Sequence, residues 1–263
     1  ELEVKKTAGS AANLRLLSSN YIELGIAQAD LIDAAYQGTG VFTGKKCQNF
    51  KAVASLYPEA CQIVVRKDSD IETIDDLQGK KVSVGEEESG SELNARQILE
   101  MSGLPEDLIK TKHLDYTDAA DKLAAGKIDA FFFTAGAQTT VVEELAKHCD
   151  IRLLNLDDKL RGKLTTAYPF YSDYTIPAGT YTGQEEDIQT VCVQSVLVAS
   201  DALDNATVKK LTKTIFAHQK GLQYATSVDL QLNESSAIKG VPIPFHPGAA
   251  AYYSERGINV KTE

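Results

Sequence analysis

Strand-like runs alternate with helix-like runs along most of these 263 residues, and this alternation limits the fold more than any other feature. Strands alternating with helices build mostly parallel sheets that carry helices on both faces. The runs with strand character are LEVKKT, YIELGIAQ, KAVASLY, CQIVVRK, KKVSVG, KHLDY, KIDAFFF, IRLLNL and TVCVQSVLV. Several are apolar on both faces, which is typical of strands buried between helices. The sequence therefore predicts an α/β protein, either one large domain or two lobes.

Three segments have the apolar spacing of amphipathic helices. The first begins near Ala11, and the second begins near Ser91 and is followed by Gly103 as a C-cap. The third is expected over about 205 to 224. Its predicted buried stripe consists of Val208, Leu211, Ile215 and Leu222.

Composition narrows the possible partners. The chain has 37 acidic and 27 basic residues, a formal charge of -10, so its average field repels polyanions and nucleic acid is excluded as a main partner. It contains no run of the roughly 18 apolar residues that a membrane span needs. It begins at Glu1 without Met or a signal-like segment, so we expect it to be a processed or trimmed chain.

The cysteines and histidines form no recognisable metal or catalytic motif. The cysteines are scattered, without a CxxC pair, so zinc is not expected. Buried free thiols are one interpretation, and a disulfide between Cys47 and Cys61 is the alternative. The four histidines accompany no G-x-S-x-G, HExxH or P-loop motif, so we expect no enzyme and no cofactor. His246 is expected to begin a helix before Pro247.

Three turns between strands and helices are rich in small residues and hydroxyls. They lie at 7–10, 85–91 and 134–136. In α/β sheets, ligands bind where strands end and helices begin, and the N–H groups of a helix start favour an anion. Each turn alone is also explained by local structure, such as Ser10 acting as an N-cap. Their repetition predicts a small anionic or zwitterionic ligand.

The same segments carry a resemblance that spans nearly the whole chain. The matching segments are GSAANLRLLSSNYIELGIAQAD, SLYPEA, DLQGKKVSVG, SGSELNARQIL, KLAAGKIDAFFFTAG, IPAGTYTGQEEDIQTV and FHPGAAAYYSERG. They resemble, in order, the TAXI family of extracytoplasmic solute receptors that serve TRAP-type transporters. The resemblance implies a type II periplasmic-binding-protein fold, in which two α/β lobes joined by hinge strands close on a ligand.

Mapped onto this chain, the resemblance places lobe one at 1–67 plus 190–263 and lobe two at 68–189. Two features depart from the family pattern. The family's first strand, helix and Gly-rich turn, about 30 residues by the size of such a unit, have no counterpart before Glu1, so we expect unpaired groups in the sheet and an incomplete site. The other departure is at Ala137-Gln138, where the family leads us to expect a proline.

The resemblance also implies the ligand-binding residues. In lobe one they are Thr7, Gly9, Ser10, Asn13 and Gln28. In lobe two and the hinge they are Ser89, Gly90, Ser91, Thr134, Gly136 and Tyr181. The residues themselves support the two helix openings, which offer N–H and hydroxyl donors to a carboxylate. For Tyr181 a packing role with a locally bonded hydroxyl is an equal alternative.

The resulting hypothesis is a monomeric periplasmic or extracellular receptor, with a lipid anchor upstream as an option. It would capture a glutamate-like amino acid or dicarboxylate and present it to TRAP permease subunits. An alternative is a sensory domain of the same fold that signals to a kinase. A hydrolase using Ser89 or Ser91 is the third reading.

Overall fold

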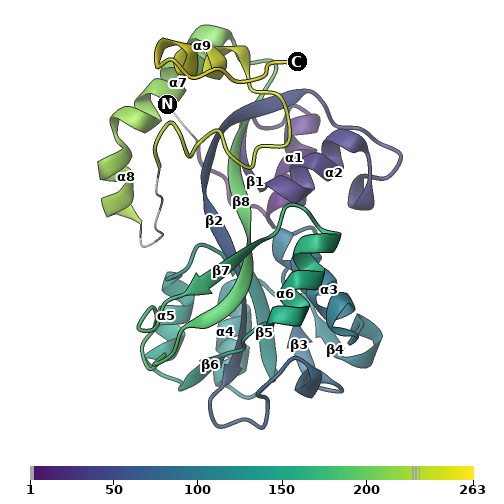
Figure 1. The fold of residues 1–263 in the computed structure, drawn as a ribbon. Helices are drawn as coiled ribbons and strands as arrows, with labels where there is room; N and C mark the ends of the chain where they lie inside the picture. Colours follow the sequence, from purple (N-terminus) through teal and green to yellow (C-terminus); the bar gives the residue numbers. More distant parts are fainter. Residues whose placement is uncertain (1–2, 227, 229, 231) are drawn as a thin grey trace. The chain divides into compact units, whose positions relative to one another are not determined.

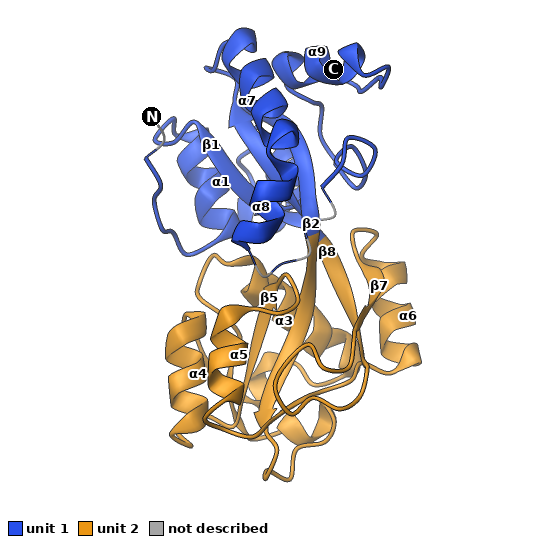
Figure 2. Ribbon diagram, turned by 90° about the vertical axis from the view of Figure 1, so that its left-hand side faces the viewer, with its two compact units in different colours: residues 1–57, 194–263 blue, residues 58–193 orange. Residues whose placement is uncertain are grey.

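The computed structural model describes residues 3–226, 228, 230 and 232–263 (Figure 1). The chain forms two compact units: unit 1 is Glu1–Tyr57 with Gln194–Glu263, and unit 2 is Pro58–Val193 (Figure 2). The predicted fold class is therefore confirmed: the chain forms two α/β units joined by two strands, and unit 1 is built from two separate segments of the chain. The first limit lies after Tyr57 rather than Lys67, and the second before Gln194 rather than Thr190. Both limits lie within continuous strands, where no turn residue marks them.

Unit 1 contains the two ends of the chain. Its elements are α1 (Ser10–Ser18), β1 (Leu24–Gln28), α2 (Ala29–Gln37), the first part of β2 (Phe50–Arg66), the second part of β8 (Ile188–Ser200), α7 (Asn205–Ala217), α8 (Gln219–Ala225) and α9 (Pro247–Glu255). Helix α1 packs on β1, and β1 pairs antiparallel with β8 from Leu24 opposite Ala199 to Gln28 opposite Ser195.

Strand β1 lies at one end of the sheet order β1-β8-β2-β5-β3-β4. The strand predicted for LEVKKT is not observed. Residues 3–7 have no regular structure, and Val4 is 91% exposed. Leu2 lies outside the described residues. An extended segment becomes a strand only when a neighbour accepts its hydrogen bonds. Residues 3–7 have no neighbouring strand in the part of the chain that the structure describes.

Unit 2 contains the middle of the chain. Its elements are the end of β2, β3 (Lys81–Ser83), α3 (Gly90–Ser102), β4 (Lys110–Lys112), α4 (Tyr116–Ala124), β5 (Ala130–Ala135), α5 (Thr140–Ala146), β6 (Ile151–Leu153), α6 (Asp158–Ala167), β7 (Ser172–Ile176) and the start of β8. Strand β3 is parallel to both β4 and β5, whereas β2 is antiparallel to β5 and β6. The strand predicted at KHLDY is misplaced, since β4 ends at Lys112 and Tyr116 already begins α4.

One long strand replaces two predicted ones. KAVASLY and CQIVVRK both belong to β2, which runs for 17 residues through Tyr57 and Pro58. Proline has no N–H for a ladder hydrogen bond, yet Pro58 lies within this continuous strand. Within unit 1, Ser55 Oγ donates to Gln194 Oε1 of β8 at 3.1 Å, and within unit 2 Thr190 Oγ1 of β8 donates to the Cys61 carbonyl.

The helix predicted over about 205 to 224 is two helices, because the backbone of His218 (φ −112°) separates α7 from α8. Val208 is fully buried, but Leu222 is 40% exposed, so its predicted place in the core is wrong. By contrast, the helix predicted from Ser91 is confirmed, and Gly103 ends it in the left-handed conformation at φ 93°.

The described cysteines are free thiols. Cys47, Cys61 and Cys192 are buried and Cys149 is half-buried, so the proposed Cys47–Cys61 disulfide is absent and the free-thiol interpretation is confirmed. Burial raises the pKa of Cys192 to about 12.

Candidate functional site

The start of α1 and the end of β1 meet in unit 1. Gly9 is the N-cap of α1 with φ 137°, a conformation that glycine adopts without strain and other residues avoid. The hydroxyl of Ser10 accepts a hydrogen bond from the Gln28 N–H at 3.1 Å. Ser10 thus ties the helix start to the strand end instead of capping its own helix.

Thr7 and Asn13 extend this cluster along the edge of β1. Thr7 Oγ1 donates to Asn13 Oδ1 at 2.7 Å, and Asn13 Nδ2 donates to the Ile26 carbonyl at 2.8 Å. The Asn13 amide therefore occupies a carbonyl that an additional strand would otherwise use. The five residues predicted for lobe one are brought together in this cluster.

In unit 2, the turn before α3 is packed closely against the helix start. Ser89 is the N-cap, and its hydroxyl accepts from the Glu92 N–H at 3.0 Å. A first helical turn has N–H groups without partners inside the helix, and the cap satisfies the one on Glu92. The Gly90 and Ser91 N–H groups are left to face an acceptor outside the helix.

The side chain of Ser91 is already engaged. Its hydroxyl accepts from the Thr134 N–H at 2.8 Å and lies 2.7 Å from the Tyr116 hydroxyl. Tyr116 in turn donates to the Thr134 carbonyl at 3.1 Å. Sequence reasoning missed Tyr116, because it treated this residue as the end of a strand. The Ser91 hydroxyl is therefore already hydrogen-bonded within unit 2.

Tyr181 braces the turn after β5. It is 2% exposed, and its hydroxyl donates to Gln62 Oε1 at 2.8 Å while accepting from the Thr139 N–H at 3.2 Å. Burial raises its pKa. The structure therefore gives Tyr181 a packed position with local hydrogen bonds. Gly136 lies in the same turn, and its carbonyl accepts from Thr139 Oγ1 at 3.4 Å.

The predicted residues of unit 2 consequently form two adjoining groups at the carboxyl end of β5. One group joins the α3 start to Thr134, and the other joins the turn from Gly136 to Thr139 with Tyr181 and β2. The arrangement offers backbone N–H donors at the α3 start, and it contains no Lys or Arg among the predicted residues. Such a set can hold a carboxylate through hydrogen bonds to amides.

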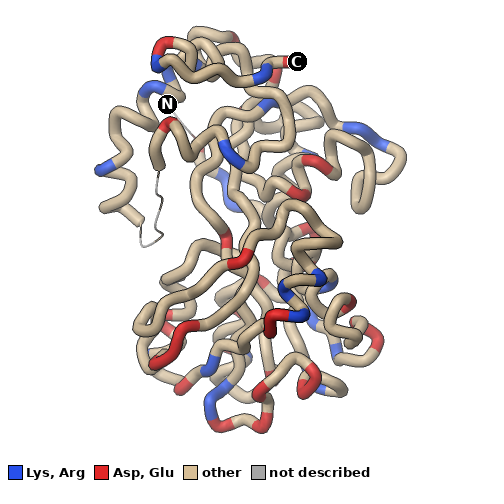
Figure 3. The backbone as a smooth tube through the Cα atoms, in the orientation of Figure 1, with Lys and Arg blue, Asp and Glu red and all other residues tan. Residues whose placement is uncertain are grey.

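The net negative charge of the chain is carried by unit 2. Unit 2 has 26 acidic against 14 basic residues, a formal charge of −12, whereas unit 1 has 11 against 13. Figure 3 shows the acidic residues distributed over unit 2. Glu87 and Glu88 are exposed just before α3, and Glu92 pairs with Arg96 at 3.0 Å. An anion bound at the α3 start must therefore rely on local donors.

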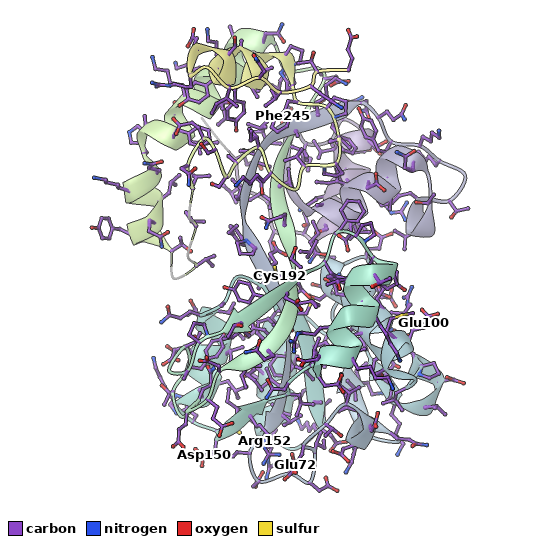
Figure 4. All side chains as sticks on the ribbon, in the orientation of Figure 1. Glu72, Glu100, Asp150, Arg152, Cys192 and Phe245 are labelled. Carbon is purple, nitrogen blue, oxygen red and sulfur yellow. The ribbon has the colours of Figure 1, made fainter. Side chains whose placement is uncertain are left out.

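A hollow of about 290 Å³ in unit 2 has Tyr181 among its lining residues. Ile151, Leu153 and Ile188 provide apolar parts of its lining, and Glu72 and Arg152 are charged residues of the lining (Figure 4). The Arg152 guanidinium is already used as a brace, since it donates to the carbonyls of Ile71 and Lys67 at 2.8 and 3.1 Å.

The described residues contain no group of three or more His, Cys, Asp or Glu side chains placed to hold a metal ion. His246 is the N-cap of α9, as predicted, and its Nδ1 accepts from the Gly248 N–H at 3.1 Å. Among the same residues, no helix combines the length and apolarity that crossing a membrane requires.

Residues 1–257 match the sequence pattern of the NMT1-like family, which covers nearly the whole chain. The chain belongs to the NMT1-like family. The TAXI receptors are a narrower group, and the resemblance to them remains a prediction.

Solved structures similar to this NMT1-like chain include two alkanesulfonate-binding proteins and an amino-acid-binding protein. The aliphatic sulphonate binding protein SsuA from Escherichia coli is 18% identical, with 97% of this chain and 82% of that chain covered at a TM-score of 0.49. SsuA from Xanthomonas axonopodis pv. citri, bound to MOPS, is 17% identical (95% and 81%, TM-score 0.48). An ancestral arginine-binding protein bound to arginine is 18% identical (81% and 72%, TM-score 0.47).

Proposed function

We propose that this NMT1-like protein is a non-catalytic extracytoplasmic receptor that captures a small carboxylate-bearing solute for a TRAP-type membrane transporter. A glutamate-like amino acid or a dicarboxylate is the proposed solute class. Membership of the family, the two-unit fold and the TAXI-like segments support this proposal. The observation that carries it is the α3 start, where Ser89 caps the Glu92 N–H. The N–H groups of Gly90 and Ser91 lie in the same first turn, where a helix provides no acceptor.

Each unit has its own set of proposed ligand-contacting groups. In unit 2 they are the N–H groups of Gly90 and Ser91 with the turn at Thr134 and Gly136. In unit 1 they are the cluster of Thr7, Gly9, Ser10, Asn13 and Gln28. The Tyr181 hydroxyl is hydrogen-bonded to Gln62 and Thr139, so Tyr181 would stabilise the turn from Gly136 to Thr139 without contacting the ligand.

Ligand-induced thermal stabilisation tests the function directly. L-Glutamate, L-aspartate, succinate and 2-oxoglutarate would be added separately, and at least one is expected to raise the melting temperature in a concentration-dependent way, because a ligand that binds only the folded state stabilises it. A melting temperature that none of these anions raises would refute the proposed solute class.

A pair of variants tests the α3 donors. Gly90 is the first helical residue, where proline is tolerated, and Ser89 already has the extended backbone that precedes proline (φ −86°, ψ 159°). Gly90→Pro removes the N–H, whereas Gly90→Ala adds bulk and keeps it. Losing a hydrogen bond to a charged group costs about 1.5–3 kcal/mol, or roughly 10- to 100-fold in affinity. Equal losses in the two variants would show that this N–H does not bind the ligand.

A further inference from the structure

Three groups from three elements form a closed ring of hydrogen bonds in unit 2. The Thr134 N–H of β5 donates to the Ser91 hydroxyl of α3, and the Tyr116 hydroxyl of α4 donates to the Thr134 carbonyl. Because Tyr116 has one proton, the 2.7 Å contact between the two hydroxyls is completed by Ser91 donating to Tyr116. Each hydroxyl then donates once and accepts once.

The sheet explains why Thr134 needs these partners. Strand β3 ends at Ser83, which lies opposite Phe131, so β3 places no residue opposite Thr134. On its other side, Thr134 lies opposite Cys61 of β2. Beyond the end of β3, the hydroxyls of Ser91 and Tyr116 therefore serve as hydrogen-bond partners of the Thr134 N–H and carbonyl groups. An unpaired backbone group at this buried position would be costly.

The position of the Tyr116 hydroxyl is itself fixed. The Tyr116 ring packs edge-on against Phe133, with 5.7 Å between the ring centroids. Tyr116 is also the first residue of α4, whose N-cap Asp115 accepts from the Asp118 N–H at 2.9 Å. Packing and capping hold the phenol in place, so its hydrogen bonds to Ser91 and Thr134 fix the α3 start relative to the end of β5.

We propose that Tyr116 is a positioning residue for the ligand site. Its hydroxyl fixes the N–H donors at the start of α3 relative to the turn that follows β5, and it does not contact the ligand. This inference rests on the proposed function, because it assigns a role within that site. Donors must be held within fractions of an ångström to bind a small anion well, and a second set of hydrogen bonds is what holds them.

Tyr171→Phe is the matched control for Tyr116→Phe. The Tyr171 hydroxyl also makes two hydrogen bonds to polar groups of unit 2, accepting from Asn94 Nδ2 at 2.7 Å and donating to Gln97 Oε1 at 2.6 Å. Both partners lie on α3, beyond its first turn. The control removes the same atom from the same kind of residue, and this atom also bonds to α3, but its loss leaves the α3 start and Thr134 connected.

The first readout is independent of any ligand. Tyr116→Phe is expected to speed amide hydrogen exchange at Thr134 about tenfold, because Ser91 loses its partner and the acceptor of the Thr134 N–H becomes mobile. Tyr171→Phe is expected to leave that exchange rate unchanged. Unchanged exchange at Thr134 in Tyr116→Phe would overturn the proposal.

The second readout is affinity for L-glutamate, L-aspartate, succinate and 2-oxoglutarate, measured by titration calorimetry. Both variants should lose similar thermal stability, but Tyr116→Phe should lower the affinity about fivefold or more, and Tyr171→Phe less than twofold. Equal affinities in the two variants, with the wild type binding normally, would overturn the positioning role and leave the receptor function intact. A wild type that binds none of the four would overturn the receptor function, and this role with it.

Discussion

A Cβ atom on residue 248 would lie only 2.4 Å from the carbonyl oxygen of Asn205, so α9 approaches α7 closely at Gly248. The same atom would lie 3.0 Å from the backbone nitrogen of Lys209. Gly248→Ala must therefore push the two helices apart, and we expect it to lower the free energy of unfolding by about 2–3 kcal/mol, as overpacking does elsewhere. Denaturant titration measures this change.

Gly162→Ala in α6 provides the control for that variant. A Cβ there meets nothing within 4 Å, so we expect a gain of about 0.5–1 kcal/mol from the better helix propensity of alanine. A Gly248→Ala protein as stable as the wild type would show that α7 and α9 can separate without cost.

Gly85 combines two constraints next to the proposed donors. Its φ is 104°, and a Cβ would lie 2.9 Å from Ser91 Cβ and 3.0 Å from Ser89 Oγ. Gly79 has a similar backbone (φ 74°) but open space around it. We expect Gly85→Ala to be more destabilising than Gly79→Ala by about 1–3 kcal/mol, and to weaken ligand binding in addition. Equal stabilities of the two variants in urea would contradict the close packing of the α3 start.

Acid should destabilise the protein through His246. Burial lowers the pKa of this imidazole, and its Nδ1 caps α9 only when unprotonated. Because the unfolded state takes up the proton first, stability is retained above pH 6.5 and falls as the pH drops below it, by up to about 1.4 kcal/mol per pH unit. His246→Asn keeps a capping oxygen that does not titrate, so its stability should vary less between pH 5 and 7. Parallel profiles for the two proteins would exclude this mechanism.

The thiols should differ in reactivity. Cys149 is half-buried, whereas Cys192 is buried with a pKa raised to about 12, so its thiolate is scarce at pH 8. We expect an aromatic disulfide reagent to modify Cys149 quickly in the native protein and all four cysteines after unfolding. In Cys149→Ser the fast phase should disappear. A fast phase that persists would mean that one of the buried thiols is accessible.

Salt should strengthen the binding of an anion. Unit 2 has a formal charge of −12 from its 26 acidic and 14 basic residues, and this field opposes an approaching carboxylate. The screening length shortens from about 30 Å at 0.01 M to about 8 Å at 0.15 M salt, so the repulsion weakens. Affinity for a dicarboxylate should rise over that range in chloride salts. A fall in affinity would indicate that nearby basic side chains bind the ligand.

The sequence predicted best those features that local chemistry determines. The α3 helix was predicted from its apolar spacing and its Gly103 C-cap, and His246 from the proline that follows it. The α/β fold class followed from the alternation of strands and helices. In each of these cases the signal and its cause lie within a few residues of each other.

The errors occurred where distant partners decide the structure. Residues 3–7 were predicted as part of a strand but have no strand beside them among the described residues, and β2 continues through Pro58 because its neighbours keep it extended. Tyr116 was missed as a site residue because its importance comes from Ser91 and Thr134, which are 25 and 18 residues away. The hydroxyl-rich turns were recognised, and for Tyr181 a locally bonded hydroxyl was one of two interpretations, but the hydrogen bonds of the Ser91 hydroxyl to Thr134 and Tyr116 were not foreseen.

The chain path through β2 and β8 makes unit 2 an insertion. The chain leaves unit 1 after Tyr57 and returns at Gln194, and on these two neighbouring strands Ser55 and Gln194 are hydrogen-bonded to each other. Unit 2 is one continuous segment, so it can be excised at the gene level without rearranging its order. The ends that remain in unit 1 lie close enough for a short turn to join them, which makes each unit accessible as a single polypeptide for separate study.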